Sequence, residues 1–206
     1  MMKILFSILF VLFFFQNIEA QIISKYGIKS GLTISSLKWE SNPYFKFENK
    51  NGFNLGIFAE FLDYSFFNIV AELNYVQKGF VLKTEITSFE HPEGTGEFRT
   101  HPSRTDYLNS TILGKIKLSQ SDFRPYFIVG TKFDFEIYNN DKIFIIQDDF
   151  AKFIPGLKVG LGTEYTISKL NFLTELLYDA NFIELYEENN LNISSSSIDI
   201  RLGIIF

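Results

Sequence analysis

Hydrophobic and polar residues alternate with a period of two along most of the chain after residue 21. In the segment 127–137, for example, Phe127 and Phe133 share one parity, whereas Lys132 and Asp134 occupy the other. Such alternation indicates β-strands with two chemically different faces. The pattern predicts eight strands, at residues 26–36, 53–62, 67–77, 107–118, 127–137, 157–167, 171–182 and 198–206.

The two faces of these predicted strands differ in charge. One parity holds no Asp, Glu, Lys or Arg, and its few exceptions to apolar character are the small residues Ser30, Ser110, Gly114, Thr131, Thr163 and Thr174. A Lys or Arg at the middle of a lipid-facing barrel wall costs about 2–4 kcal/mol, so an uncharged parity is typical of a wall in hydrocarbon. The opposite parity carries the charges Lys29, Glu60, Glu72, Lys115, Lys117, Lys132, Asp134, Glu136, Lys158, Glu164, Glu175, Asp179, Asp199 and Arg201.

The segments between the predicted strands alternate between long and short. The long, polar segments are 38–51, 79–104, 139–152 and 184–193, and the short ones are 63–66, 119–123 and 168–169. Outer-membrane barrels have long external loops and tight periplasmic turns in this alternating order. The expected fold is therefore all-β, an eight-stranded antiparallel up-and-down transmembrane barrel. Alternation alone also fits a soluble periplasmic lipocalin-like binding barrel whose apolar face points inward.

The first twenty residues have the layout of a secretory signal peptide. Lys3 gives a positive start, residues 4–15 form an apolar core, and Ala20 ends a cleavage-like segment. This core is shorter than the ~20 apolar residues that a membrane-spanning helix needs. We therefore expect residues 1–20 to be a signal peptide and residues 21–206 to form one outer-membrane β-barrel domain.

Composition supports this interpretation and excludes several functions. The 206 residues suffice for one domain, and 25 Phe and 10 Tyr favour pleated surfaces. No cysteine is present, so the chain has neither disulfides nor a thiolate zinc site. The net charge is −5 without a basic run, which argues against nucleic acid as a partner.

No set of residues identifies a reaction. His91 and His101 are the only histidines, and both lie in the longest loop without the fixed spacing of metal ligands. A nucleophile with a positioned base cannot be identified. We therefore assign no catalytic, cofactor-binding or metal-binding residue and expect no cofactor and no enzyme. A surface hydrolase that uses His91 or His101 is the weakest of the alternatives.

The inward charges are expected to pair with one another. An eight-stranded barrel is just wide enough to be filled by its own side chains. Unpaired buried charge is costly, so Glu72, Glu175, Arg201, Lys115 and their neighbours should form ion pairs. This predicts a filled polar core, and the alternative is a narrow transport pore or a proton-linked path.

The long loops are the candidate recognition elements, because exposed segments on a rigid scaffold commonly carry binding. We expect a monomeric barrel that contacts outer-membrane lipid and a possible protein partner through extracellular loops 79–104 and 139–152. The second loop includes the apolar run Ile143-Phe144-Ile145-Ile146. The leading hypothesis is a non-enzymatic protein with a structural role or an interaction with a surface or secretion-machinery partner.

Several short motifs resemble a known family. They are Gly27-Ile28-Lys29-Ser30-Gly31-Leu32, Ala71-Glu72-Leu73-Asn74-Tyr75 with Lys78-Gly79, Tyr107-Leu108 with Leu113-Gly114-Lys115, Phe127-Ile128-Val129-Gly130 and Gly203-Ile204-Ile205-Phe206. Together they are similar to the Bacteroidetes-type outer-membrane β-barrel family, the PorT-like group. Phe206 resembles the terminal signal that the outer-membrane assembly machinery reads. The chain departs from the family at Asn109-Ser110-Thr111, where a Pro is common. The resemblance implies location and fold, and little about activity.

Overall fold

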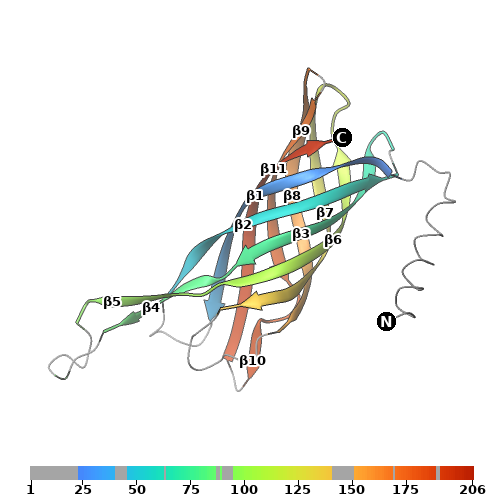
Figure 1. The fold of residues 1–206 in the computed structure, drawn as a ribbon. Coiled ribbons are helices and arrows are strands. Elements are labelled where there is room, and N and C mark those ends of the chain that lie inside the picture. The colour runs from blue at the N-terminus through green and yellow to red at the C-terminus, as the bar shows by residue number, and fades with distance from the viewer. Residues whose placement is uncertain are drawn as a thin grey trace, which may run out of the picture.

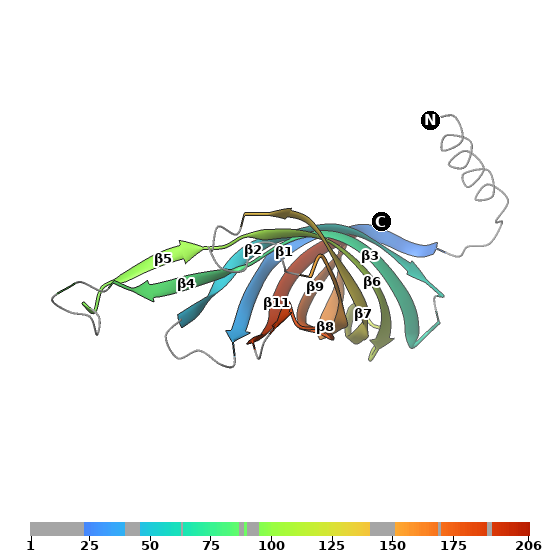
Figure 2. The same ribbon diagram turned by 90° about the horizontal axis from the view of Figure 1, so that it is seen from below.

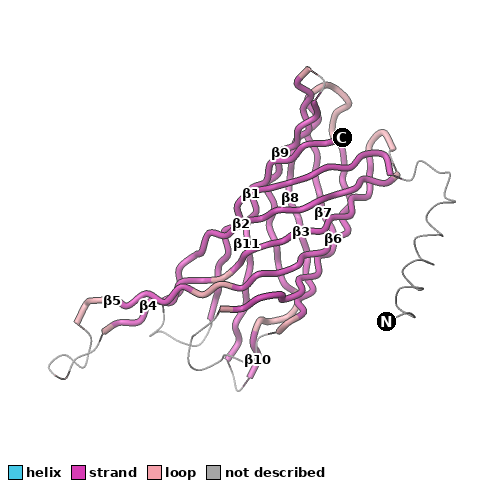
Figure 3. Tube along the Cα trace, in the orientation of Figure 1, coloured by secondary structure: helices cyan, strands magenta, loops and turns pink. Residues whose placement is uncertain are grey.

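The structure is a computed structural model that describes residues 23–39, 46–62, 64–86, 89, 95–140, 151–168, 170–188 and 191–206. Regular structure in these ranges consists of strands, as the magenta tube in Figure 3 shows. No helix among them is long and apolar enough to span a membrane. The expected signal peptide, His91, the apolar run 143–146 and the rest of loop 141–150 lie outside the described residues.

Eight long strands form a closed antiparallel barrel, which confirms the predicted fold class (Figure 1). Each strand pairs with its neighbour in the order β1, β2, β3, β6, β7, β8, β9, β11, and β11 returns to pair with β1. Closure leaves no free edge in the barrel wall. The strands are β1 Ile23–Trp39, β2 Lys46–Phe61, β3 Phe67–Lys78, β6 Thr105–Lys117, β7 Phe123–Asn139, β8 Phe153–Ile167, β9 Leu170–Asn181 and β11 Leu191–Ile205.

The two ends of the barrel differ. At one end, the turn end, short connections join β2 to β3, β6 to β7 and β8 to β9, and the Phe206 amide donates to the Tyr26 carbonyl. At the opposite end, the loop end, several strands run further than the sequence predicts. β1 continues to Trp39, β2 begins at Lys46, and the short strand β10 (Tyr186–Glu188) pairs with the start of β11. The predicted loops 38–51 and 184–193 are therefore partly wrong.

The segment 79–104, predicted as a loop, contains a hairpin of its own. β4 (Phe80–Glu85) pairs with the first residues of β2, and β5 (Phe98–Pro102) pairs with β4 alone. We call the β4–β5 hairpin the arm, and Figure 2 shows it projecting from the barrel. It begins at Gly79, whose φ of 152° accompanies a close approach to the Ser103 carbonyl. The sequence missed the arm because its residues alternate for only a few positions.

The two faces of the wall are as predicted at mid-strand. Outward side chains such as Ile57 and Leu161 are more than half exposed, whereas inward Glu72 and Arg201 are buried. A soluble barrel with an apolar interior would show the opposite arrangement, so the lipocalin-like alternative does not describe this chain. The exposed apolar band instead has the form of a lipid-facing wall.

Inward glycines make room for large side chains on neighbouring strands. Gly27 lies directly opposite Phe58, and Gly162 lies directly opposite Tyr126. A methyl group at Gly162 would lie 2.5 Å from Tyr126 Cζ, and one at Gly27 would lie 2.6 Å from the Phe58 ring. Each aromatic ring therefore leans across a glycine, which lets a narrow barrel enclose a crowded interior.

Candidate functional site

A central cluster of four charged side chains crosses the barrel interior. Arg201 Nη1 lies 2.9 Å from Glu72 Oε2, and Arg201 Nη2 lies 2.7 Å from Glu175 Oε2. Lys29 Nζ contacts the same two carboxylates, at 2.6 Å and 2.8 Å. The four residues come from β11, β3, β9 and β1, and all are buried. Two cations thus neutralise two carboxylates, which offsets the cost of removing them from water.

A second cluster lies nearer the turn end. Lys115 on β6 contacts Glu60 at 2.5 Å and also pairs with Glu164. Lys25 reaches Glu164 from β1 at 3.0 Å, and Asn68 donates to Glu60 at 2.7 Å. Glu60 therefore has one charged and one neutral partner and Glu164 has two lysines, so that both buried carboxylates are hydrogen-bonded.

A third cluster lies nearer the loop end. Asp134 accepts hydrogen bonds from Lys132 at 2.5 Å and from Lys78 at 2.9 Å. The other ion pairs of this cluster are Lys78–Asp179 at 3.3 Å, Lys158–Asp179 at 3.5 Å and Lys158–Asp199 at 3.3 Å. Carboxylates and ammonium groups therefore alternate through the cluster, and their charges neutralise one another.

Neutral side chains join the three clusters into one continuous network. The Tyr126 hydroxyl donates to Glu175 at 2.8 Å, and Lys115 Nζ lies 4.3 Å from the centre of the Tyr126 ring. Asn74 and Asn109 connect the central cluster to the loop-end cluster. The hydrogen bonds of this connection are Asn74 Nδ2 to Glu72 Oε2 at 3.3 Å, Asn74 Nδ2 to Asn109 Oδ1 at 3.3 Å and Asn109 Nδ2 to Asp134 Oδ1 at 2.5 Å.

The predicted ion pairing is right in kind and partly wrong in detail. Arg201 does pair with Glu72 and Glu175. Lys115, which the sequence placed with the same group, belongs instead to the turn-end cluster. Lys78 lies one residue beyond its predicted strand, and so the sequence missed its place in the network.

A hydrophobic cluster closes the interior at the loop end. It packs side chains from β1, β4, β6, β8, β11 and the segment between β9 and β10 above the loop-end ion pairs, and we call it the cap. The members of the cap are Leu37, Phe80, Leu82, Tyr107, Ile154, Leu185 and Ile193. The cap thus covers the loop-end ion pairs with packed apolar side chains.

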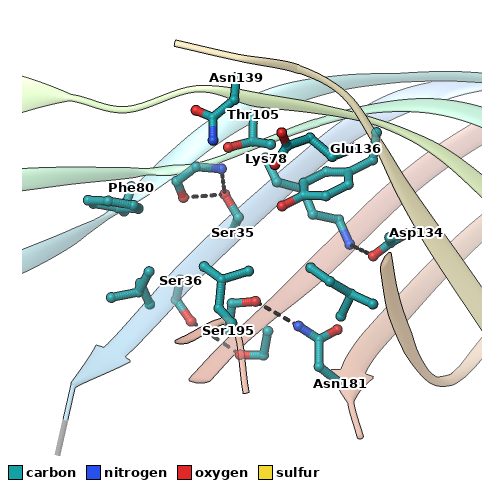
Figure 4. A pocket seen from close by; sticks show the side chains of 16 residues that line it. Ser35, Ser36, Lys78, Phe80, Thr105, Asp134, Glu136, Asn139, Asn181 and Ser195 are labelled. Atoms are coloured by element: carbon teal, nitrogen blue, oxygen red, sulfur yellow. Dashed lines mark hydrogen bonds and ion pairs between the residues drawn. The ribbon is translucent and has the colours of Figure 1, made fainter. Parts of the chain in front are cut away.

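A small cavity lies beside the cap. Its polar lining includes Ser35, Lys78, Asp134, Asn181 and Ser195, which Figure 4 shows around the gap. Its volume is about 30 Å³. That is room for water, and far below the ~300 Å³ at which small-molecule sites begin.

The residues that could have supported chemistry do not assemble into a site. His101 lies in β5 with its side chain exposed, and it pairs across the arm with Leu82. Within the described ranges, no three His, Asp or Glu side chains come together in a way that could hold a metal ion. Glu187 and Glu188, the acidic pair of the last loop, lie in β10. The interior network is thus the main polar assembly of the described residues, and its ion pairs contribute to the packing of the barrel interior.

The arm has an anchored base and an exposed outer strand. All five residues of β5 are exposed. At the base, Arg104 holds Asp106 through two hydrogen bonds of 2.8 Å, and the Tyr75 hydroxyl donates to the same carboxylate at 2.7 Å. On the arm itself, Lys83 pairs with Glu48 of β2 at 2.7 Å.

Solved structures similar to this chain are barrels of outer-membrane proteins. OprG from Pseudomonas aeruginosa shares 13% identity over 88% of this chain and 95% of its own, with a TM-score of 0.46. Ail of Yersinia pestis, in complex with the heparin analogue sucrose octasulfate, shares 13% over 88% and 98%, with a TM-score of 0.43. The N-terminal β-barrel domain of OprF from Pseudomonas aeruginosa shares 9% over 86% and 97%, with a TM-score of 0.39.

A search of curated proteins finds no match. A family model described as "Outer membrane protein beta-barrel domain" matches residues 16–187. The matched range covers most of the chain and extends through seven of the eight barrel strands, β1 to β9. The chain therefore belongs to the outer membrane protein β-barrel domain family, and it is a small barrel of the outer membrane.

Proposed function

We propose that this protein is a non-enzymatic outer-membrane barrel that presents the arm to a protein partner outside the cell. The observation that carries the proposal is the fully exposed strand β5 on a hairpin that leaves the barrel. The interior supports it indirectly, because a network of ion pairs under a hydrophobic cap offers no site for a substrate. Proteins commonly carry an exposed binding segment on a rigid scaffold.

The free edge of β5 suits the addition of a strand from a partner. The Ile86 amide donates to the Glu97 carbonyl and the Ser103 amide donates to the Phe80 carbonyl, which fixes the alternation of backbone groups along β5. The amides of Phe98 and Thr100 consequently point away from β4. An extended peptide can pair with such an edge, while side chains such as Phe98 provide selectivity.

The base of the arm is anchored in the barrel, so the edge is held in place. Phe80 and Leu82 of β4 belong to the cap. Lys50 of β2 donates to the Ser103 carbonyl, and Arg104 is held by Asp106. A strand edge whose position is already fixed, such as that of β5, loses less conformational entropy on binding than a flexible loop does. The resemblance to the PorT-like group makes the secretion machinery one candidate source of the partner.

Shortening the arm tests the proposal. Residues 83–100 are replaced by an Asn-Gly turn that joins Leu82 directly to its cross-strand partner His101, a pair whose backbone groups face each other, which leaves Leu82 and the rest of the cap in place. Thr100→Pro is a second variant, because it removes an outward amide without shortening the arm. Glu48→Gln on β2 is the control. Partners are captured by cross-linking on intact cells that display each variant.

We expect one cross-linked partner with the wild type and with Glu48→Gln, and its loss in both arm variants. Heat-modifiable gel migration shows whether each variant still folds as a barrel. Recovery of the same partner by the shortened arm would refute the role of β5, and so would the absence of any partner from wild-type cells.

A narrow pore is the second candidate, because polar side chains run without a break from Lys25 to Lys78. Single-channel recording in planar bilayers decides between the two. The closed interior predicts silence at all salts and voltages, whereas discrete openings would favour the pore.

A further inference from the structure

A groove of about 680 Å³ lies on the outward face of the wall, over β1, β2, β3 and β6. It opens on the side of the wall opposite to the ion pairs of the interior network, and it does not include the arm. Its outward lining is apolar apart from the hydroxyls of Tyr26 and Ser110. The residues that line the groove are Tyr26, Gly27, Ile28, Ile57, Phe58, Ala59, Ala71, Glu72, Leu73, Ser110, Thr111, Ile112 and Phe206.

Small side chains produce the groove. Ala59 of β2 lies directly opposite Ala71 of β3, and the same cross-strand row continues to Tyr26 and Ile112. Two adjacent alanines make the side-chain layer thin at this point. The lining also includes positions such as Glu72, whose buried side chains point inward, so the floor of the groove reaches the strand backbone.

The groove occupies the half of the wall that is nearer the turn end. The Tyr26 and Phe206 rings border it there, with their centres 5.9 Å apart. Aromatic side chains commonly mark the boundary between hydrocarbon and headgroups. From this border the groove extends toward mid-wall at Leu73 and Ser110, along the direction that a lipid tail takes in the membrane.

We propose that this groove holds an acyl chain of a phospholipid from the leaflet at the turn end. Hydrocarbon is the surrounding medium on this face, and a flexible chain can follow an irregular hollow and gain dispersion contacts there. A second copy of the protein is a poorer occupant. Association between proteins in a membrane depends on close packing because no hydrophobic driving force exists, and the convex wall of a second barrel would leave the hollow at Ala59 and Ala71 unfilled.

Filling the groove tests the proposal. Ala71→Phe places a ring where the acyl chain would lie. Ala180→Phe is the matched control, because Ala180 is also a half-buried outward alanine but lies on β9, outside the groove. Ala59→Leu is a second filling variant in case the first does not fold. Each protein is folded into vesicles of phosphatidylethanolamine and phosphatidylglycerol, extracted in mild detergent and weighed by native mass spectrometry.

We expect the wild type and Ala180→Phe to retain one phospholipid per chain. In Ala71→Phe the retained fraction should fall about tenfold, which corresponds to about 1.4 kcal/mol of binding free energy. Equal retention in all variants, or no retained lipid in the wild type, would overturn the proposal. A wild-type dimer that Ala71→Phe converts to a monomer would also overturn it, in favour of a protein interface. The proposal does not depend on the arm, since none of the groove residues lies in β4 or β5.

Discussion

Arg201 is the single residue on which most of the central cluster depends. Its guanidinium bridges Glu72 and Glu175 at the middle of the barrel, and its side chain is fully enclosed. Without it, Lys29 alone would face two buried carboxylates. Arginine suits this position because its planar fork can serve two carboxylates at once.

We therefore predict that Arg201→Met destabilises the folded barrel by about 3–5 kcal/mol, the usual cost of breaking a buried ion pair from one side. Urea unfolding of the protein in lipid vesicles measures the change. Lys83→Met removes a cation whose partner, Glu48, is partly exposed to solvent, and it should cost at most about 1 kcal/mol. Similar values for the two variants would mean that the interior is hydrated and the network is weak.

Gly162 allows Tyr126 to connect two of the ionic clusters. An added methyl group would lie 2.6 Å from the Tyr126 hydroxyl oxygen, so Gly162→Ala must displace the ring and its hydrogen bond to Glu175. We predict a loss of about 1–3 kcal/mol in the same unfolding experiment, as for other overpacked interiors. Gly114→Ala is the control, because a methyl group there meets nothing closer than 3.1 Å. An unchanged stability for Gly162→Ala would show that Tyr126 is free to move.

At the scale of the strands, outward and inward side chains alternate regularly along the middle of each barrel strand. Leu161, outward in the middle of β8, is more than half exposed. We predict that Leu161→Lys costs about 2–4 kcal/mol, since the ammonium group would lie in hydrocarbon. Thr100→Lys on the exposed β5 should change stability by less than about 0.5 kcal/mol. Equal effects at both positions would indicate that Leu161 faces water.

The same difference explains how much of the fold the sequence could predict. Around Leu161, lipid on one side and enclosed charge on the other enforce a period of two, and the strand is found where it was expected. In the arm, β5 is exposed and β4 is only six residues long, and both were therefore taken for a loop. The strand ends at Trp39 and Lys46 were also missed.

The partners within the interior were harder to predict than its polarity. Parity alone shows that Lys115 and Glu72 both point inward. Their distance depends on the stagger of β3 against β6, which places Lys115 opposite Asn68 and Glu72 opposite Thr111. Register is fixed by the closure of the whole barrel, and so the clusters could be assigned only once the strand pairs were known.

At the scale of the whole molecule, the barrel combines three environments in a narrow volume. The outward wall is apolar, the interior is an ion-paired network closed by the cap, and the arm projects from the loop end. Charge neutrality within each ionic cluster lowers the cost of enclosing many charges in a narrow barrel.

Spin labels test the central claim, that the apolar face meets hydrocarbon while the charged face is enclosed. The chain has no cysteine, so single cysteines can be introduced without a background. Labels at the outward positions Val129 and Leu161 and at the inward positions Ile128 and Leu177 are compared in lipid vesicles. We expect the outward labels to collide with oxygen, which partitions into hydrocarbon, and to avoid a water-soluble nickel reagent. The inward labels should be protected from both. Outward labels that meet the nickel reagent as freely as a label in water would contradict the account.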